Sequence, residues 1–458
     1  MENQPVKGST PPNPRRKVRS KKQIFQETYL PFLILVAALI ILVTIVAALM
    51  DGLGPSDDPT DDIDQSVQLQ QEADALLKQA TERALHYDYA GALEILHSFR
   101  GELEQFPALE DAILYYTATM HSMVTWTADQ VPNLSFHVLL EDLDAALADP
   151  TYGEKGKNLY NRNFITTREF SAILEQLYEN GYVLVQLSDF YVYEDGRYQE
   201  QQLRLPIGKK PLILTETHCN YYSYMVDLDR DGQPDSNGAG FASKLCWQNG
   251  FYNEMVRSDG STTTGAFDLV PILENFIKLH PDFSYQGARA ILAFSGYDGV
   301  FGYRITAENL DEEALVAERR EAATLARKLR EAGYVIACYT YNNTDYSIRS
   351  AAEIEKDIGL WQELIAPVVG ETDILVFAQD ADIGTSYANN TKFDVLYDHG
   401  YRFFLGSTPF LSQEIHDNYV RHSRLMVTAS ALAHNSQWFS DVFSSDGLLD
   451  QRRGDIPK

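Results

Sequence analysis

The residues best suited to bind a metal ion form one short acidic segment. Its carboxylates recur at alternate positions around a glycine, as Asp227, Asp229, Asp231, Gly232 and Asp235. In calcium loops, oxygen ligands at positions 1, 3, 5 and 9 surround the ion and Gly at position 6 permits the turn. Position 12 is Gly238 instead of the usual bidentate Glu, so a full EF-hand is not expected. Two interpretations stay open, a Ca²⁺ loop completed by a later carboxylate and a plain acidic turn.

Carboxylates and tyrosines also follow several short apolar runs. Glu216, Asp380 and Asp382 lie at such positions, and a pair of carboxylates is typical of glycosidic acid-base catalysis. In a chain with 65 acidic residues, solvated loop acids are the alternative. The aromatic residues at or near these ends are Tyr221, Tyr222, Tyr224, Trp247, Tyr297, Tyr303, Tyr339 and Tyr341. Tyr and Trp stack on sugar rings or pack half-buried with equal ease, and we expect Tyr339 and Tyr341 to face a pocket.

Short apolar runs alternate with amphipathic helices from about residue 126 onward. The runs typical of strands are Tyr182–Leu187, Pro211–Leu214, Ala290–Phe294, Tyr334–Cys338, Ile374–Phe377 and Phe403–Leu405. The predicted helices are Thr167–Asn180, Asp268–Leu279, Asp311–Ala332, Ser350–Ile365 and Thr391–Gly400. This alternation predicts a parallel sheet covered by helices, as a barrel or a doubly wound sheet. Functional residues of such folds follow the carboxyl ends of the strands.

The charge distribution places the amino terminus at a membrane. Residues 1–28 carry seven Lys or Arg against two Glu, and Tyr29–Met50 is a run of 22 uncharged residues. That length spans a bilayer, and a basic arm stays on the cytoplasmic side. We therefore predict a single-pass anchor with the rest of the chain outside. The alternative is a cleaved signal peptide, whose apolar region is usually shorter.

Two segments connect the predicted anchor to the strand-helix region. Residues 51–65 are rich in Gly, Pro and Asp and read as an extended acidic spacer. Residues 66–125 show three- and four-residue apolar spacing, which predicts two helices that turn near Tyr87 and Asp88. The phrase HYDYAGALEIL resembles one tetratricopeptide hairpin, although such arrays need about three repeats. A helical stalk is the simpler interpretation.

The overall charge excludes one class of partner. With 38 Lys and Arg against 65 Asp and Glu, the net charge is -27. Nucleic-acid binding depends on neutralising phosphates with basic side chains, so no nucleic-acid partner is expected.

The order of several motifs resembles the polysaccharide deacetylase family from about Val131 to Pro457. The motifs are VPNLSFH, REFSAILEQLYENGYVLVQLSDFY, KKPLILTETHCNYYSYM, GYVIACYTYNN, TDILVFAQDADIG and HGYRFFLGSTP. The resemblance implies an irregular (β/α) barrel that removes acetyl groups from cell-wall glycans with a divalent metal, and it matches His137 to the first strand. Such chemistry needs a metal-activated water, a carboxylate base and a later acid.

The same resemblance implies a degenerate active site. In Thr215-Glu216-Thr217-His218, Thr217 takes the position of the family's base and His218 that of its first metal ligand. The two-histidine motif is replaced by Tyr339 and Asn343, and the substrate-groove motif by Gln379 and Asp380, while Thr428-Ala429 takes the place of an Asp-Gly. One His with a Tyr and an Asn is a poor divalent site, so we expect no transition metal at His218. Tyr221, Tyr222, Tyr341, Gln379 and Asp380 are the predicted substrate contacts.

Cys219 and Cys338 flank the two degenerate motifs. Sequence does not supply the Cα separation that a disulfide requires, and buried free thiols are the simpler interpretation.

Together these observations predict a membrane-anchored envelope protein whose segments are 1–28, 29–50, 51–65, 66–125 and a deacetylase-like domain at 126–458. We expect this domain to bind a wall glycan without deacetylating it. An active metal-dependent deacetylase and a scaffold for an envelope protein are the alternatives.

Overall fold

The computed structural model describes residues 60–148, 159–225, 240–257, 259–306 and 310–458. The predicted anchor at 29–50 and the acidic loop with Asp227, Asp229, Asp231 and Asp235 lie outside these residues. Within the described part, no helix combines the length and the apolar character needed to cross a bilayer. The chain divides into two compact units, Met1–Leu69 and Gln70–Lys458, and the second unit contains the barrel.

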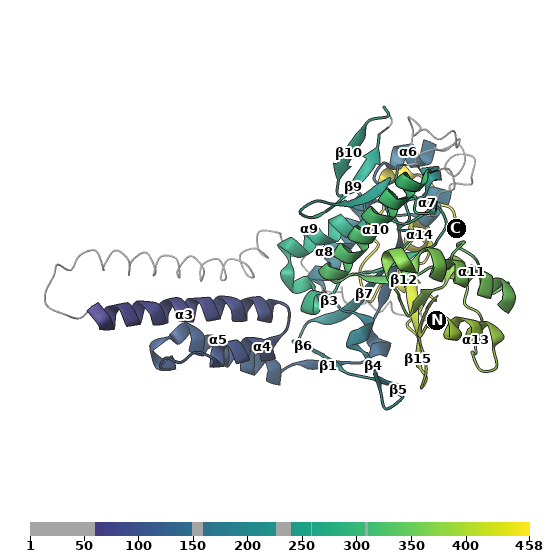
Figure 1. Cartoon of the computed structure of the whole chain (residues 1–458). Coiled ribbons are helices and arrows are strands. Elements are labelled where there is room, and N and C mark those ends of the chain that lie inside the picture. Colours follow the sequence, from purple (N-terminus) through teal and green to yellow (C-terminus); the bar gives the residue numbers. More distant parts are fainter. Residues whose placement is uncertain (1–59, 149–158, 226–239, 258, 307–309) are drawn as a thin grey trace, which may run out of the picture. The chain divides into compact units, whose positions relative to one another are not determined.

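Seven parallel strands close into a barrel (Figure 1). Around the ring the order is β2 (Asn133–His137), β7 (Lys210–Thr217), β11 (Ile291–Phe294), β12 (Val335–Cys338), β13 (Ile374–Val376), β14 (Phe403–Ser407) and β16 (Val420–Met426). The ring closes where Leu425 of β16 pairs with Leu134 of β2. Because parallel strands all end at the same rim, the side chains that follow them meet at one mouth.

Helices cover the outside of the ring (Figure 1). They are α6 (Leu143–Ala148), α7 (Leu159–Asn163), α8 (Thr167–Glu179), α9 (Leu269–Leu279), α10 (Glu312–Ala332), α11 (Ala351–Leu364), α12 (Ala366–Val369), α13 (Thr391–Asp398) and α14 (Ala429–His434). Their ends follow local chemistry. The hydroxyl of Thr166 and the carboxylate of Glu169 form a capping box at the start of α8, and Gly333 ends α10 with a left-handed φ of 103°.

Short strands lie outside the ring. They are β1 (Val124–Trp126) with β6 (Leu203–Leu205), β4 (Tyr191–Glu194) with β5 (Arg197–Glu200), the sheet of β8 (Lys244–Trp247), β9 (Phe251–Val256) and β10 (Thr262–Gly265), and β15 (Gln413–Ile415) beside β16. β3 (Tyr182–Leu184) pairs with β7 in parallel but does not belong to the closed ring.

The strand-helix alternation predicted from sequence is confirmed, and the sheet is a barrel. Each predicted helix contains or matches an observed one, from α8 to α13. One run was predicted too long, because Tyr182–Leu187 forms only the three-residue β3 before the chain enters a 3-10 turn at Leu187. The ring strand β16 has no counterpart among the predicted runs, since charged and polar residues interrupt its apolar pattern.

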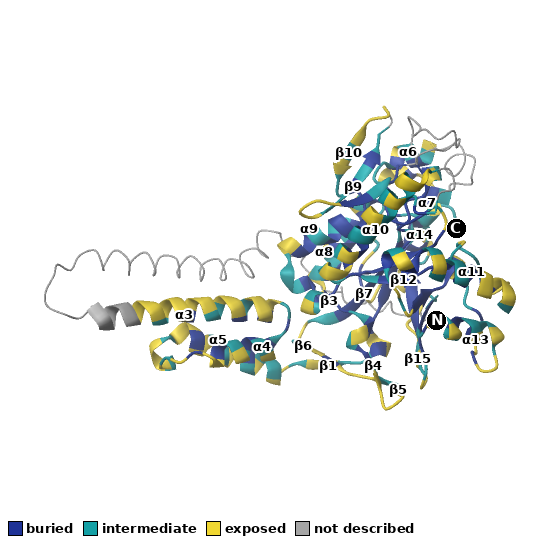
Figure 2. Cartoon of the chain, viewed as in Figure 1, coloured by how far each residue is buried: buried dark blue, intermediate teal, exposed yellow. Residues whose placement is uncertain are grey.

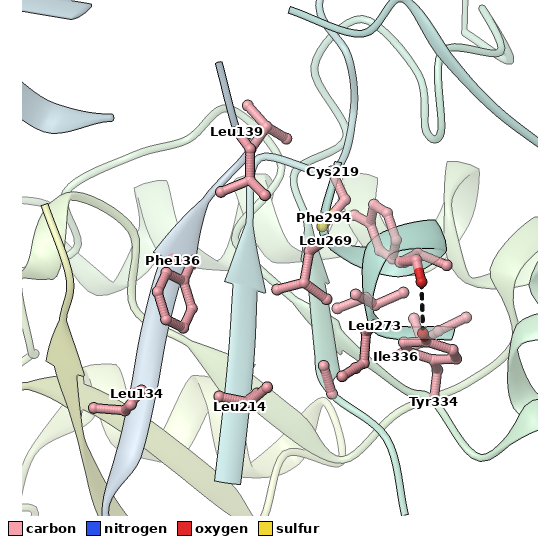
Figure 3. Close-up of a cluster of buried hydrophobic side chains, with 14 of the residues drawn as sticks. Leu134, Phe136, Leu139, Leu214, Cys219, Leu269, Leu273, Phe294, Tyr334 and Ile336 are labelled. Atoms are coloured by element: carbon pink, nitrogen blue, oxygen red, sulfur yellow. Dashed lines mark hydrogen bonds between the residues drawn. The ribbon is translucent and has the colours of Figure 1, made fainter. Parts of the chain in front are cut away.

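The two faces of the ring strands differ in chemistry. Leu134, Phe136 and Leu214 point outward and belong to the same buried apolar cluster as Leu269 and Leu273 of α9 (Figure 3). The alternate residues are polar and bond one another, as where Thr215 Oγ1 donates to Asn133 Oδ1 at 2.8 Å. On β2 and β7 the side-chain period of two therefore separates an apolar outer face from a largely polar inner face, whereas the neighbouring β11 turns Ile291 and Ala293 inward.

Three helices precede the barrel, where the apolar spacing predicts two, namely α3 (Thr60–Leu85), α4 (Tyr89–His97) and α5 (Pro107–His121). α3 begins within the predicted extended spacer, so that prediction was wrong for residues 60–65. The predicted turn near residues 87 and 88 is confirmed, with Tyr87 at a φ of 67° and Asp88 capping α4. Much of α3 is exposed (Figure 2). The main chain of His86 accepts a hydrogen bond from Gln286 N at 3.0 Å, which joins this segment to the barrel domain. The tetratricopeptide resemblance stays a prediction.

A buried ion pair attaches the carboxyl terminus to the barrel. Arg453 and Glu169 have side chains that are each 1% exposed, and Arg453 Nη2 lies 2.7 Å from Glu169 Oε2. Arg453 also donates to Asn161 Oδ1 at 3.0 Å and to the carbonyl of Phe164 at 3.0 Å. Because α7 contains Asn161 and Phe164 follows it, this arginine also supports the helix that borders the mouth.

We predict that Arg453→Ala lowers the free energy of unfolding by about 3–5 kcal/mol, because it leaves the carboxylate of Glu169 buried without its cation. Arg452→Ala is the control, since the neighbouring side chain is 52% exposed and surface pairs contribute about 0–1 kcal/mol. Chemical denaturation of both variants measures the difference. Equal losses in the two variants would contradict the structural role given to Arg453.

Candidate functional site

A cavity of about 550 Å³ opens at the carboxyl rim of the barrel. Residues at or just after strand ends contribute His137, His218, Tyr339, Asn343, Gln379, Asp380 and Thr428 to its lining. The remaining lining residues are Leu159, Tyr160, Asn163 and Phe164, on or next to α7, and Tyr224 from the 3-10 turn at Ser223–Met225. The lining combines aromatic rings, uncharged polar groups and one carboxylate.

The backbone at this rim adopts conformations that non-glycine residues rarely take. His218, Asn343, Gln379 and Asp380 have φ values of 65°, 50°, 56° and 56°. Left-handed conformations of such residues cost free energy and persist where the surrounding structure holds them. Three strand ends therefore turn sharply at the same place, and the turns carry lining side chains.

Two imidazoles lie side by side in the cavity wall. The ring centroids of His137 and His218 are 4.9 Å apart, and His218 also meets Tyr339 edge-on at 5.1 Å. Burial lowers the pKa of His137 to about 4, and the nearby Arg424 guanidinium acts in the same direction. Burial and then His137 hold the pKa of His218 well below its usual range. Both imidazoles are therefore neutral at physiological pH.

A fully buried arginine lies inside the barrel beneath the mouth. Arg424 donates to Ser135 Oγ at 2.8 Å, to the carbonyl of Phe377 at 3.2 Å and to the carbonyl of Leu405 at 3.3 Å. Its Nη2 also lies 3.3 Å from Asp380 Oδ1. The lining carboxylate of Asp380 is thus paired with a cation from β16.

Glu216 points away from the cavity, although its neighbours in sequence, Thr215 and Thr217, point into the barrel. Its side chain is fully buried on the outer face of β7, close to the buried carboxyl group of Asp268 at the start of α9. If both groups were ionised, the two oxygens of Glu216 would have no hydrogen-bond donor. Burial first, and then the negative charge of Asp268, raise the pKa of Glu216 well above its ordinary value. One proton shared by the two carboxyl groups satisfies both observations.

Five of the predicted site residues line the cavity, namely His218, Tyr339, Asn343, Gln379 and Asp380. Thr217 and Tyr222 lie behind it and hydrogen-bond to the two histidines.

Two predicted contacts lie elsewhere. The ring of Tyr221 is 1% exposed and its phenol accepts a hydrogen bond from Asn253, while the ring of Tyr341 packs over Gly296. Neither residue lines the cavity.

The acids at the strand ends do not form a catalytic pair. Glu216 faces α9, Asp380 pairs with Arg424, and Asp382 pairs with Arg421 at 3.0 Å. The geometry of glycosidic acid-base catalysis requires two carboxyl groups that flank one bond, and these three groups have separate partners.

Several lining residues were not predicted as site residues. His137 was matched to the first strand without a role, and Tyr160 and Phe164 lie on or beside α7, far in sequence from the strand ends of the other lining residues. Arg424 lies beneath the cavity on β16, a strand that the apolar pattern does not predict, so its place inside the barrel had no signal in the sequence.

Cys219 and Cys338 are free and buried, so the prediction of free thiols is confirmed.

The donor set at the mouth does not fit the metal of a carbohydrate deacetylase. In the part of the chain that the structure describes, no three His, Cys, Asp or Glu side chains converge on a point where they could hold a metal ion. His137 and His218 offer two nitrogens, the neighbouring lining positions are Tyr339 and Asn343, and Asp380 is paired with Arg424. A catalytic zinc site needs three protein ligands.

Comparison with known proteins gives a distant structural similarity and no matching sequence family. No protein-family model matches the sequence, and no curated protein sequence is significantly similar. Among solved structures, the chain is similar to "Streptococcus pyogenes deacetylase PplD in complex with acetate". The alignment covers 69% of this chain and 98% of that chain with 10% sequence identity and a TM-score of 0.36. A similarity this distant says nothing of what this chain does.

We predict that Glu216→Gln makes stability less sensitive to alkaline pH. In the wild type, Glu216 keeps its proton when folded but loses it near pH 4.5 when unfolded, so unfolding releases a proton and the free energy of unfolding falls as pH rises. The largest slope is about 1.4 kcal/mol per pH unit for one proton. A glutamine amide still donates to Asp268 and does not titrate.

Thermal or denaturant unfolding between pH 5 and pH 9 checks this, with Glu175→Gln on the exposed side of α8 as the control. Parallel pH profiles for the wild type and Glu216→Gln would show that the two carboxyl groups do not share a proton.

Proposed function

We propose that the mouth of the barrel binds an uncharged segment of a cell-wall glycan without deacetylating it. The observation that carries the proposal is the composition of the cavity. Tyr160, Tyr224 and Tyr339 provide rings with polar tips, and two neutral imidazoles and the amides of Asn343 and Gln379 provide hydrogen-bonding groups. This combination suits sugar rings, which have apolar faces and polar edges.

The residue at the position of the water-activating base is a threonine, which supports glycan binding instead of hydrolysis. Thr217 Oγ1 contacts His137 Nδ1 at 2.7 Å and donates to the carbonyl of Phe136 at 3.3 Å. A threonine hydroxyl does not accept a proton at neutral pH, and the adjacent carboxyl group of Glu216 is on the other face of β7. Asp380 is the lining carboxylate, and its Oδ1 is paired with the Arg424 cation at 3.3 Å.

The proposed setting is the outer side of a cell membrane. It follows from the basic arm at 1–28 and the apolar run at 29–50, which favour an anchored and exported protein. In that setting the acidic segment that begins at residue 51 and continues into α3 at Thr60 would hold the barrel away from the bilayer. The barrel would then be a deacetylase-like domain that has kept glycan binding.

We predict that the full chain binds a soluble neutral oligosaccharide and that Tyr224→Ala weakens binding about 5- to 30-fold, through loss of a stacking surface worth about 1–2 kcal/mol. Tyr224 stacks on Tyr222 with ring centroids 5.4 Å apart, so its ring has a fixed orientation. Isothermal titration calorimetry with cellotetraose and chitotetraose measures the affinities.

Tyr193→Ala is the matched control, because Tyr193 is 59% exposed on β4 and does not line the cavity. No detectable binding of either tetrasaccharide to the wild type, or equal losses in the two variants, would overturn the proposal.

An active metal-dependent deacetylase is the second candidate, and the adjacent imidazoles of His137 and His218 are the observation in its favour. We predict no release of acetate from chitotetraose above background with Zn²⁺, Mn²⁺, Co²⁺ or Ni²⁺, because the lining offers two imidazoles and one carboxylate, and that carboxylate is paired with Arg424. Metal-dependent acetate release that His218→Ala abolishes would establish the enzyme instead. Elemental analysis of both proteins provides an independent measure of bound metal.

A further inference from the structure

We infer that His137 and His218 are held in opposite tautomers, so that the cavity wall presents one hydrogen-bond acceptor beside one donor. Their ring centroids are 4.9 Å apart, and each ring has its Nδ1 beside a hydroxyl group. A neutral imidazole carries a proton on one nitrogen only, so the partner of Nδ1 determines what Nε2 can do. The selection of the bound group, argued below, rests on the proposed function, whereas the assignment of the two tautomers does not.

The partner of His137 is a hydroxyl whose proton is directed elsewhere. Thr217 Oγ1 donates to the carbonyl of Phe136 at 3.3 Å. A hydroxyl has a single proton, and we assign that of Thr217 to the carbonyl of Phe136, which can only accept. The oxygen of Thr217, 2.7 Å from His137 Nδ1, is then the acceptor. His137 therefore carries its proton on Nδ1, and its Nε2 is an acceptor.

The partner of His218 is the middle of a chain of hydroxyls. Tyr222 OH lies 3.2 Å from His218 Nδ1 and 2.9 Å from Ser295 Oγ. Ser295 is fully buried, and a buried hydroxyl is stable when its proton has an acceptor, which here is the phenol oxygen. Ser295 then donates to Tyr222, and Tyr222 donates to His218 Nδ1. His218 therefore carries its proton on Nε2, which is a donor.

This pair of nitrogens selects the chemical class of the bound group. A hydroxyl or a secondary amide has both a donor and an acceptor and satisfies both imidazoles. A carboxylate cannot donate to the lone pair of His137, and an ammonium group cannot accept from the N–H of His218. A metal ion would need lone pairs on both Nε2 atoms, which requires the Ser295 to Tyr222 chain to reverse. The site is thus specific for an uncharged polar group, such as the hydroxyl or amide groups of a sugar.

The tautomers are measured directly in the full chain without any ligand. Histidine labelled with ¹⁵N gives nitrogen shifts and long-range couplings that distinguish Nδ1–H from Nε2–H, and His137→Gln and His218→Gln assign the signals. We expect Nδ1–H at His137 and Nε2–H at His218. The same tautomer at both residues would overturn the inference, whatever the protein binds.

A matched pair of variants tests whether Thr217 determines the tautomer of His137. Thr217→Val removes the acceptor of His137 with little change in shape, so the population of Nε2–H at His137 is expected to rise. Thr217→Ser keeps a hydroxyl and is expected to keep Nδ1–H. An unchanged tautomer in Thr217→Val would show that Thr217 does not hold the proton of His137.

Titration with four tetrasaccharides tests the recognition. Cellotetraose supplies hydroxyls, chitotetraose supplies amides, its fully deacetylated form supplies ammonium groups, and tetragalacturonate supplies carboxylates. We expect at least one neutral oligomer to bind roughly tenfold or more tightly than both charged ones, because each charged group leaves one imidazole unpaired.

Tighter binding of a charged oligomer would overturn the proposed selection. Failure of all four to bind, with opposite tautomers observed, would overturn the proposed function and the recognition but leave the tautomer assignment in place.

Discussion

The guanidinium of Arg424 is the interaction on which the arrangement at the mouth depends. It is fully buried inside the ring and bonds groups from β2, β14 and the turn after β13, while its own strand is β16. A buried cation is stable only when its donors are satisfied and a counter-charge is close. Asp380 provides that charge, so the residue that contributes a carboxylate to the cavity also balances the interior of the barrel.

The same cation favours neutral histidines. It acts with burial to lower the pKa of His137 and of His218. Neutral imidazoles need hydroxyl partners more than carboxylate partners, and Thr217 and Tyr222 fill those positions. The mouth therefore combines one ion pair, between Arg424 and Asp380, with a lining of mainly uncharged hydrogen-bonding groups.

The alternation of β7 separates two kinds of polar residue. Thr215 and Thr217 belong to the polar interior, whereas Glu216 enters the layer between strand and helix and faces Asp268. A carboxyl group in that layer is held by a shared proton and by the start of α9, whose Leu269 N donates to Asp268 Oδ1 at 2.9 Å. Glu216 is adjacent to Thr217 in sequence, yet it contributes to the packing of α9 and not to the cavity.

Much of the fold was predictable because the alternation of apolar runs and amphipathic helices follows directly from what each element buries. The predicted helices α8, α9, α10, α11 and α13 and five of the seven ring strands lie where their apolar patterns predict them. β16 escaped prediction because two arginines and a histidine break its apolar pattern, and Arg424 is fully buried inside the closed ring. The order of the motifs also predicted a set of residues that do line one cavity, namely His218, Tyr339, Asn343, Gln379 and Asp380. It assigned substrate contacts to Tyr221 and Tyr341 as well, but their packing does not support that role.

The sequence by itself determined the order of the elements and the strand ends that meet at the mouth, because these depend on residue type and local spacing. Only the tertiary structure decided which side chains share a space. The pairing of His137 with His218, the joining of Tyr160 on α7 to the strand ends, and the partners of Arg424 all connect residues more than 50 positions apart or on different strands. Such contacts arise from closure of the ring, and no local pattern encodes them.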